Sequence, residues 1–463
     1  MSKPLASSEK HLASFAQLAS SACIENLPNS VVNEGRRILI DGISAILAGV
    51  REKPMATLAK QMASDSNHQE STILGTQYRT DAAWAALVNA TAGVWHQLDP
   101  GNRFTGGHPA IHAIAAGLAM AEREKVSGKK MLEAVIAGYE IGARVGLATT
   151  LRPGMHPHGS WTVVGAAVTA GRLMGNDKAG LMDVINLSTS FNLATSCQTA
   201  NEGATVLNIY AGFSAAMGIL AADLKQCGFS AERDGIRTVF GSIAGVFYDA
   251  DKAVEEIGTR WEIERGYHTT FACDRRIHSA LEALITLVEE ENIPVENVDR
   301  IFVQTFSEAS RLNDISPQNP SAAKRSIPHV LASYLVLREP GLASCHEKTL
   351  HDPSVKALAA RILLREDPEL TKRTPTQWPA RIIIKLRSGE DRIHTVFLPA
   401  GEFDTKPLGD DALIEKFRTL TLKSFRPQTV DQMIDLLGHV EDVPDIGQFI
   451  HLTADIQKPA NCP

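Results

Sequence analysis

The sequence predicts a mainly α-helical protein with an inserted α+β domain. Ala-rich and apolar residues at helical spacing fill its first part, β-branched stretches appear only after residue 266, and short helical patterns return near the end. We therefore expect a large helical domain in residues 1–265, a smaller α+β domain in 266–402, and a return to the helical domain in 403–463.

The helical domain is predicted from four segments. Residues 31–49 carry apolar side chains at near-helical spacing, and Gly49 is suited to end that helix. Residues 81–96, 109–124 and 161–175 are rich in alanine, with small residues three and four positions apart. Such residues let helices approach closely, so we expect a tightly packed helical core.

The α+β domain is predicted from two β-rich stretches. Residues 300–306 are β-branched and aromatic, and residues 380–401 form two strand-like runs joined by a turn at 388–391, which is typical of a hairpin. Helical patterns lie between and after these stretches, over 276–291, 322–338, 354–364 and 408–440.

The composition excludes several classes of protein. The 463 residues carry 46 Lys and Arg against 53 Asp and Glu, a formal net charge of −7, so nucleic acid is not an expected partner. We find no run of about 18 uncharged apolar residues and expect no membrane-spanning helix. A pocket on an acidic protein can still be basic, so small anionic substrates remain open.

The cysteines and the N-terminus indicate a reducing compartment. The six cysteines are scattered without zinc-binding spacing, and a disulfide framework is not expected in a chain of this size. The first residues, MSKPLASSEKHLASF, have no apolar core of a secretory signal. We expect a cytoplasmic protein.

The motifs for nucleotide binding, serine hydrolysis and zinc peptidases are absent from the sequence: it has no GxGxxG, GxxxxGK[ST], GxSxG or HExxH. The candidate chemistry therefore lies in polar loops between helices. The first loop, residues 95–112, contains His96, Asp99, Asn102, Arg103, His108 and His112.

His108 is the strongest candidate in the first loop. Pro109 suits the first turn of a helix and would put His108 at its N-terminal end. There the helix dipole favours a bound anion and disfavours an imidazolium, so a neutral imidazole could act as a general base. The alternative is structural, because Asp and His also cap helices.

The second loop, residues 152–161, places His156 and His158 on either side of a proline. In an extended chain alternate side chains point in opposite directions, so we expect at most one of the two to face a given pocket. A surface turn is the alternative. A metal site of His108, His156 and His158 is conceivable, although the spacing is not diagnostic.

The third stretch, residues 266–284, lies at the predicted domain boundary. Cys273 could act as a nucleophile with His268 or His278, although a buried structural cysteine is the commoner outcome. Arg275 is better suited to bind a carboxylate, because a guanidinium pairs with it through two parallel bonds.

In this order the segments resemble the MmgE/PrpD superfamily of 2-methylcitrate dehydratase, cis-aconitate decarboxylase and iminodisuccinate epimerase. The resemblance covers most of the chain. It rests on LIDGISAILAG (39–49), VNATAGVWHQLD and GHPAIHAIAAGLAMAE (within 88–122), GYEIGARVG (138–146), MHPHGSWTVVGAAVTAGRLMG (155–175) and FACDRRIHSALEAL (271–284).

The resemblance implies a helical domain built from both ends of the chain, an inserted α+β domain, a homodimer, and a site between the domains. By position, Asp99, His108 and His156 match the catalytic and substrate-orienting residues of the family. We expect Arg103 and Arg275 to bind carboxylate, with Asn102, His158 and His268 as further substrate-binding residues, and we expect no cofactor or metal.

The chain also departs from the family. Asp99 is followed by Pro100-Gly101-Asn102, where the family has Phe-Asp-Asp, and Arg103 stands at a threonine position. Two family lysines that hold substrate carboxylates fall at Leu207 and Thr269. We therefore expect a substrate smaller or less charged than a tricarboxylate.

The resulting hypothesis is a cofactor-independent lyase or epimerase that moves a proton at the carbon next to a carboxylate, by dehydration, epimerisation or decarboxylation. The first rival is a carboxylate-binding protein that lost catalysis together with the lysines. A weaker rival is a metal-dependent lyase.

Overall fold

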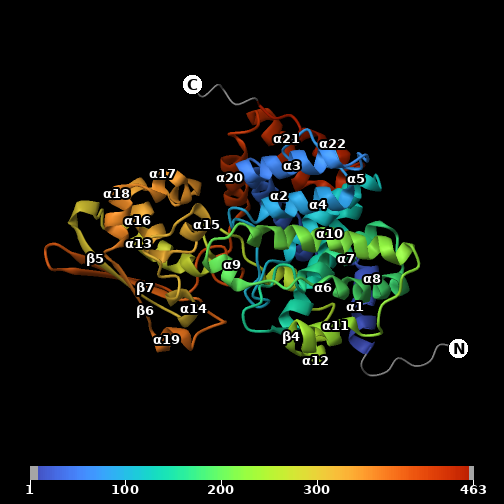
Figure 1. Ribbon diagram of the computed structural model, residues 1–463, viewed down its shortest axis with the longest axis horizontal. Coiled ribbons are helices and arrows are strands. Elements are labelled where there is room, and N and C mark those ends of the chain that lie inside the picture. The colour runs from blue at the N-terminus through green and yellow to red at the C-terminus, as the bar shows by residue number, and fades with distance from the viewer. Residues whose placement is uncertain (1–8, 458–463) are drawn as a thin grey trace.

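The Ala-rich segments form one large helical body in the computed structural model, which describes residues 9–457 (Figure 1). Residues 1–8, in the stretch considered for a secretory signal, and Cys462 lie outside the described part. The helices of the body are α1 (Lys10–Ser21), α2 (Asn29–Gly49), α3 (Lys53–Asp65), α4 (Ala82–Gly93), α5 (Pro109–Arg123), α6 (Gly128–Ala148), α7 (Thr162–Leu173), α8 (Lys178–Ser188), α9 (Cys197–Asn201), α10 (Val206–Gln226), α11 (Gly235–Thr238) and α12 (Ala250–Val254).

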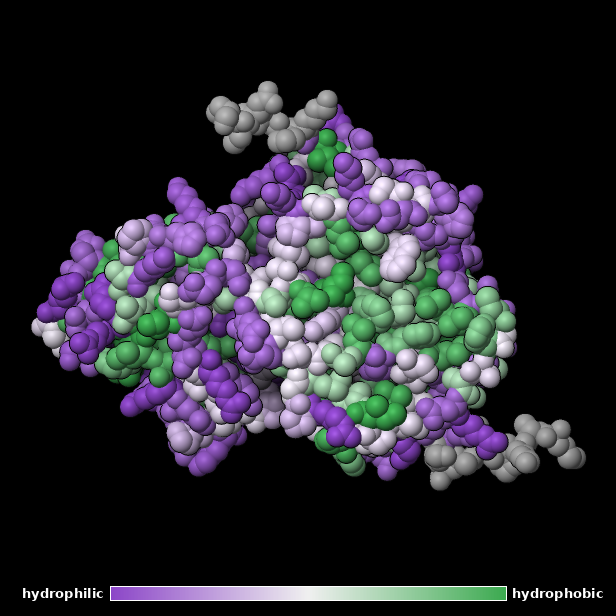
Figure 2. Space-filling view, in the orientation of Figure 1, coloured by the Kyte–Doolittle hydropathy of each residue, from purple (hydrophilic) through white to green (hydrophobic). Residues whose placement is uncertain are grey.

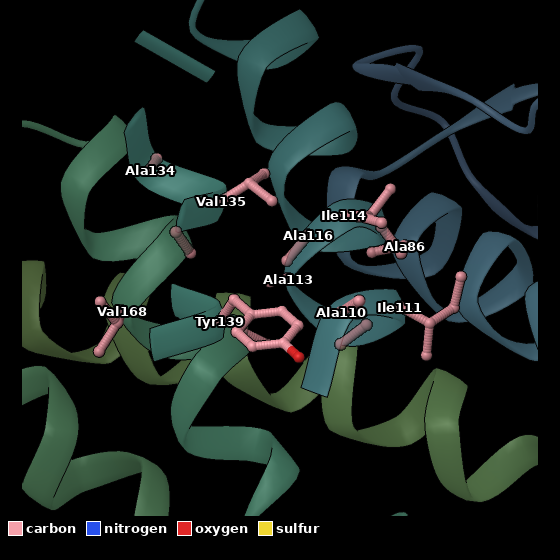
Figure 3. Close-up of a cluster of buried hydrophobic side chains, with 14 of the residues drawn as sticks. Ala86, Ala110, Ile111, Ala113, Ile114, Ala116, Ala134, Val135, Tyr139 and Val168 are labelled. Carbon is pink, nitrogen blue, oxygen red and sulfur yellow. The ribbon is translucent and has the colours of Figure 1, made fainter. Parts of the chain in front are cut away.

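Small residues bring the central helices into close contact, as predicted. A methyl group at Gly138 of α6 would lie 2.5 Å from the carbonyl oxygen of Gly165 on α7, so the two backbones touch. Figure 3 shows the neighbouring core, where alanines of α4, α5 and α6 alternate with larger side chains such as Ile111, Ile114 and Tyr139. The expectation of a tightly packed helical core is confirmed.

Two short antiparallel strand pairs lie at the edges of this body. They are β1 (Ser71–Thr72) with β2 (Arg79–Thr80), and β3 (Thr149–Leu151) with β4 (Gly245–Tyr248).

The smaller body has a separate hydrophobic core and a four-stranded mixed sheet of order β6-β5-β7-β8. β5 pairs parallel with β6 and antiparallel with β7, and β7 pairs antiparallel with β8, as the predicted hairpin requires. The strands are β5 (Val298–Thr305), β6 (Ile362–Glu366), β7 (Ala380–Leu386) and β8 (Asp391–Val396). The helices are α13 (His278–Glu290), α14 (Ser307–Ser310), α15 (Pro320–Ala323), α16 (Ile327–Leu337), α17 (Glu347–Leu350), α18 (Pro353–Ala359) and α19 (Pro368–Thr371).

Two predicted helices of this body are shorter than expected. The segment 354–364 divides into α18 and the start of β6, because Ile362 pairs with Ile301 of β5. The segment 322–338 begins as α15 and restarts as α16, where the Ser326 hydroxyl accepts a hydrogen bond from the backbone N–H of His329. This N-cap leaves Lys324 and Arg325 in the connection between the two helices.

The end of the chain returns to the helical body, as predicted. The helices α20 (Asp410–Thr421), α21 (Pro427–Gly438) and α22 (Gly447–Leu452) add Phe417, Met433 and Phe449 to the same core as α1 and α2. The predicted fold class is confirmed, whereas the boundaries at 265 and 402 stay predictions.

One helix, α10, is long and apolar enough to cross a membrane by length and composition alone. It packs against α4, α7 and α8, and over half of its apolar window is buried. Such packing and burial are typical of a core helix in a helical domain.

Candidate active site

A cavity of about 300 Å³ lies where the two bodies meet. The two polar loops of the helical body, residues 95–112 and 152–161, form one side of the cavity. The smaller body contributes residues that lie just before α13 and α16. The lining residues are Val94, Gln97, Asp99, Gly106, His108, His156, Pro157, His158, Cys197, Leu207, Asn208, Tyr267, Thr269, Asp274, Arg275, Arg276, Arg325 and Trp378. The volume suits a small organic molecule.

His108 and Asp99 form an ion pair in the wall of this cavity. His108 is the residue before α5, with Pro109 in the first turn as predicted. Its Nδ1 lies 2.9 Å from Oδ2 of the buried Asp99, although neither atom makes a well-directed hydrogen bond within residues 9–457. Burial disfavours the charged imidazole, but the Asp99 carboxylate outweighs it and raises the pKa of His108. Asp99 therefore favours the protonated form of His108, and this opposes the effect that we expected from the helix dipole.

His156 and His158 both line the cavity, contrary to the expectation that at most one would. Their rings stack with centroids 5.1 Å apart and planes 23° apart. The reason is that residues 157–161 form a turn, with Gly159 at a φ of 81°, instead of an extended strand. The turn brings both imidazoles to the same side.

The electrostatics keep His156 neutral. Burial, together with the positive charge of Arg325 and His108, lowers its pKa to about 3. Its Nδ1 accepts a hydrogen bond from the backbone N–H of His158 at 3.2 Å, so the single ring proton resides on Nε2. His156 is thus a hydrogen-bond donor at neutral pH.

His112 supports this group from α5. Its Nε2 lies 3.0 Å from Nδ1 of His158, and the two rings share one hydrogen bond. Burial and the neighbouring His108 lower the pKa of His112 to about 3, and burial lowers that of His158 well below its usual range. The cavity therefore combines one histidine of raised pKa with three that stay neutral.

The backbone of the first loop is fixed by contact with the smaller body. Gly101 and Tyr267 exchange two backbone hydrogen bonds, of 3.0 and 2.8 Å. A side chain at Gly101 would lie 2.4 Å from the Tyr267 ring, so the absence of a side chain at this position permits the close approach. This pairing holds Asp99 at the cavity.

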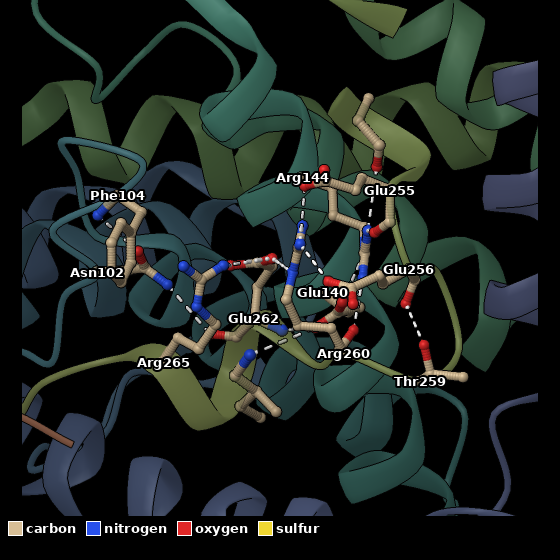
Figure 4. Close-up of polar contacts among 12 residues, drawn as sticks. Asn102, Phe104, Glu140, Arg144, Glu255, Glu256, Thr259, Arg260, Glu262 and Arg265 are labelled. Atoms are coloured by element: carbon tan, nitrogen blue, oxygen red, sulfur yellow. Dashed lines mark hydrogen bonds and ion pairs between the residues drawn. The ribbon is translucent and has the colours of Figure 1, made fainter. Parts of the chain in front are cut away.

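Three predicted substrate-binding residues lie away from the lining of the cavity. Arg103 pairs with Glu402, at 2.5 Å, and with Asp404. The Asn102 side chain donates to the carbonyl of Glu262 and accepts from the backbone N–H of Phe104, within a network that ties the loop to the helical body (Figure 4).

His268 is the third of these residues, and it lies in a separate buried cluster. Its two ring nitrogens contact Asp41, at 2.7 Å, and Glu34, at 2.9 Å. The side-chain groups of Asn102 and His268 and the terminal nitrogens of Arg103 bind within the protein, whereas Nε of Arg103 has no partner among residues 9–457. The structure therefore does not place these three residues in contact with a substrate in this cavity.

Arg275 does line the cavity, but its terminal nitrogens are engaged. They donate to Glu402, to the carbonyl of Ala400 and toward His278, and the guanidinium lies over the Tyr267 ring. Cys273 is buried outside the lining, and its carbonyl oxygen, not its thiol, contacts His278. The geometry gives no nucleophile–base pair there.

The sequence reasoning missed Arg325 and did not choose Arg276. Both line the cavity and both pair with Asp274. Arg276 is adjacent to the arginine that was chosen, whereas Arg325 is about 50 residues away, and no pattern in the sequence connects it to the loops.

A metal could find ligands at the same cavity. Asp99, His108 and His158 offer ligand atoms that all lie within 4.8 Å of one another, a set that differs from the three histidines considered from sequence. A carboxylate with two imidazoles fits a divalent transition metal, so the metal-dependent alternative stays open.

Comparison with known proteins identifies the family. The MmgE/PrpD N-terminal domain matches residues 13–255, and the MmgE/PrpD C-terminal domain matches residues 271–439. The chain belongs to the MmgE/PrpD family. The predicted resemblance is confirmed.

Similar proteins include three cis-aconitate decarboxylases. That of Aspergillus terreus (strain NIH 2624 / FGSC A1156) is 22% identical and covers 97% of this chain and 96% of its own length. Those of Mus musculus and Homo sapiens are 22% and 23% identical, over 95% and 93% of this chain and 92% of their own lengths. Family membership and these relatives support a lyase-type enzyme that processes an organic acid.

Proposed function

We propose that this MmgE/PrpD protein removes or returns a proton at the carbon next to a carboxylate of a small organic acid. The observation that carries the proposal is the His108–Asp99 ion pair beside the neutral His156 in one cavity. His108 can take up and release a proton beside the Asp99 carboxylate, and His156 can donate a hydrogen bond without changing its charge.

The chemistry needs both groups. A proton next to a carboxylate is very weakly acidic, so the site must supply a base and stabilise the enediolate that forms. A positioned acid or base contributes about 10²–10⁴-fold, and aimed hydrogen-bond donors often contribute more. In our proposal His108 accepts and returns the proton, Asp99 stabilises its imidazolium, and the Nε2–H of His156 donates to the enediolate oxygen.

Two outcomes start from the enediolate that proton removal forms: loss of a β-hydroxyl gives dehydration, and return of the proton to the other face gives epimerisation. Decarboxylation reaches a carbanion by loss of carbon dioxide instead, and the site then only returns a proton to that carbon. Leu207 and Thr269, which the resemblance places at the positions of two family lysines, both line the cavity. We therefore propose an acid smaller or less charged than a tricarboxylate.

The test is proton exchange at carbon. The protein is incubated in D₂O with small hydroxy-, amino- and unsaturated dicarboxylates, and the α-proton signals are followed by NMR. We expect exchange or conversion of at least one acid, reduced at least about 100-fold by His108→Gln or His156→Ala.

His96→Gln is the matched control. His96 lies on the same loop and pairs with Glu52 at 3.3 Å, outside the lining of the cavity. Stabilisation of the protein by acids without exchange of any of them would favour the rival function, a carboxylate-binding protein. Activity that is lost on chelation and restored by one added divalent metal would favour the metal-dependent rival at Asp99, His108 and His158.

We also propose that the protein is a cytoplasmic homodimer. Support for a dimer comes from an apolar stripe on the outer side of α10, part of the green region over this helix in Figure 2. Its members recur every three or four residues and are exposed or half-buried: Val206, Ile209, Phe213, Met217, Leu220 and Leu224. Two copies of one stripe can pack symmetrically.

Light scattering tests the dimer. The measured mass should be twice the 50.0 kDa chain mass, and Phe213→Glu should reduce it to the mass of one chain. A monomeric wild type would refute the proposed dimer.

A further inference from the structure

The wall of the cavity formed by the smaller body contains two guanidinium groups on one carboxylate. Arg276 donates to Asp274 through Nε and a terminal nitrogen, each at 2.8 Å. A terminal nitrogen of Arg325 lies 3.1 Å from Oδ2 of Asp274. All three side chains line the cavity.

This group carries an excess positive charge and spare hydrogen-bond donors. Two guanidiniums against one carboxylate leave a net charge of +1. The Nε of Arg325 is buried and has no hydrogen-bond partner in the part of the chain that the structure describes. The other nearby acid is Glu308, which is exposed on α14, where water screens it.

The group lies next to the histidines. The positive charges of Arg325 and Arg276 both act on His156, whose ring stacks on His158, and the His158 ring lies 5.4 Å from that of His108. The cationic group and the His108–Asp99 pair therefore line the same cavity, in which the His158 ring contacts both the His156 ring and the His108 ring. Arg275 has its terminal nitrogens engaged, so Arg276 and Arg325 are the better available carboxylate binders.

We infer that Arg276 and Arg325, held by Asp274, bind a second carboxylate of the substrate, which is then a dicarboxylate with its reacting carbon near His108. This rests on the proposed function. A guanidinium pair binds a carboxylate through charge-assisted, directional bonds.

The experiment measures how much one negative charge on the ligand contributes to its affinity, while the shape of the ligand stays nearly the same. Isothermal titration compares succinate with succinamate and glutarate with glutaramate, since each pair differs by one carboxylate converted to an amide. We expect the dicarboxylate of at least one pair to bind the wild type about tenfold or more tightly than its amide. Arg325→Gln and Arg276→Gln should each reduce this preference to within about threefold.

The controls separate charge, folding and catalysis. Arg365→Gln removes an exposed arginine of β6, outside the lining, and should leave the preference unchanged. The melting temperature of each variant verifies folding, and having two arginine variants guards against one that fails to fold. His108→Gln should keep the preference while losing proton exchange.

Three results would overturn the inference: no binding of either pair, equal binding of acid and amide to the wild type, or an unchanged preference in both arginine variants. The proposed function fails differently. In that case the charge preference persists and depends on the arginines, while no acid exchanges its α-proton in the wild type.

Discussion

Two clusters in this protein are built from histidine and carboxylate, yet they differ in how completely their atoms are paired. In the first, at the cavity, the His108–Asp99 contact is poorly directed, and Nδ1 of His112 has no partner among the described residues. In the second, between the bodies, both ring nitrogens of His268 are bonded, and the two oxygens of Asp41 meet His268 and Lys416. We propose that the incompletely paired cluster is the reactive one and that the fully paired cluster is structural, since the residue types are the same in both.

The second cluster joins distant parts of the chain. Lys416 of α20 also donates to the carbonyl oxygens of Leu98 and Thr269, so one ammonium connects the C-terminal helices, the first loop and the edge of the smaller body. Burial opposes the charged imidazole, but the hydrogen bonds that His268 donates to Asp41 and Glu34 raise its pKa to about 9. His268 therefore stays charged at neutral pH, and its ion pairs with Asp41 and Glu34 hold these segments of the chain together.

The largest expected effect comes from removing the carboxylate of the first cluster. Asp99→Asn should lower kcat by about 10²–10⁴-fold, because the imidazolium of His108 loses its counterion. The pH–rate inflection of His108 should also move to lower pH, since Asp99 is what raises its pKa. Steady-state kinetics between pH 5 and 9 measure both, and an unchanged inflection would contradict the assignment.

The equivalent change in the second cluster should affect stability instead. Asp41→Asn leaves His268 and Lys416 with one fewer charged partner in a buried place, which costs about 3–5 kcal/mol of unfolding free energy. Urea denaturation measures the loss, and kcat at low temperature should stay within about threefold. A variant that is stable but inactive would place Asp41 in the chemistry.

His268 and the neutral histidines of the cavity should also give opposite pH dependence of stability. His268 has a raised pKa, so its contribution is complete below pH 6.5 and is lost as the pH rises through about 9. His112 and His156 have pKa values lowered to about 3, so stability is lost as the pH falls from 6.5 towards 3. For each whole proton by which the folded and unfolded states differ, the free energy of unfolding changes by about 1.4 kcal/mol per pH unit.

Denaturation at a series of pH values tests this contrast. His268→Gln should reduce the loss of stability between pH 6.5 and 9, leaving the part that His108 contributes through its own raised pKa, whereas His68→Gln, at an exposed histidine, should not reduce it. An alkaline slope that is unchanged in His268→Gln would assign it to another group.

The smallest effect is expected at Arg103. Arg103→Lys keeps the charge beside Glu402 and Asp404 but loses the forked pairing, at a cost of about 1 kcal/mol in stability. KM should stay within about threefold, because the residue does not line the cavity. A tenfold rise in KM at unchanged stability would restore the predicted contact with substrate.

The sequence predicted the elements well where local pattern decides them. Ala-rich helical spacing, the hairpin and Pro109 after His108 are all local signals. The ion pairs of Arg103 and His268 were not predictable, because their partners lie far away in sequence. Glu402 is about 300 residues after Arg103, and Asp41 is more than 200 residues before His268. Arg325 enters the cavity only because the cap of α16 leaves it in a connection that folds onto Asp274.

The central claim is that the cavity cluster moves a proton while the second cluster holds the fold. Its most direct test is α-deuterium incorporation by NMR in His108→Gln and His268→Gln, each measured with its melting temperature. We predict that His108→Gln loses exchange at a nearly unchanged melting temperature, and that His268→Gln retains exchange at a lowered one. Retained exchange in His108→Gln, or lost exchange in a fully stable His268→Gln, would contradict the account.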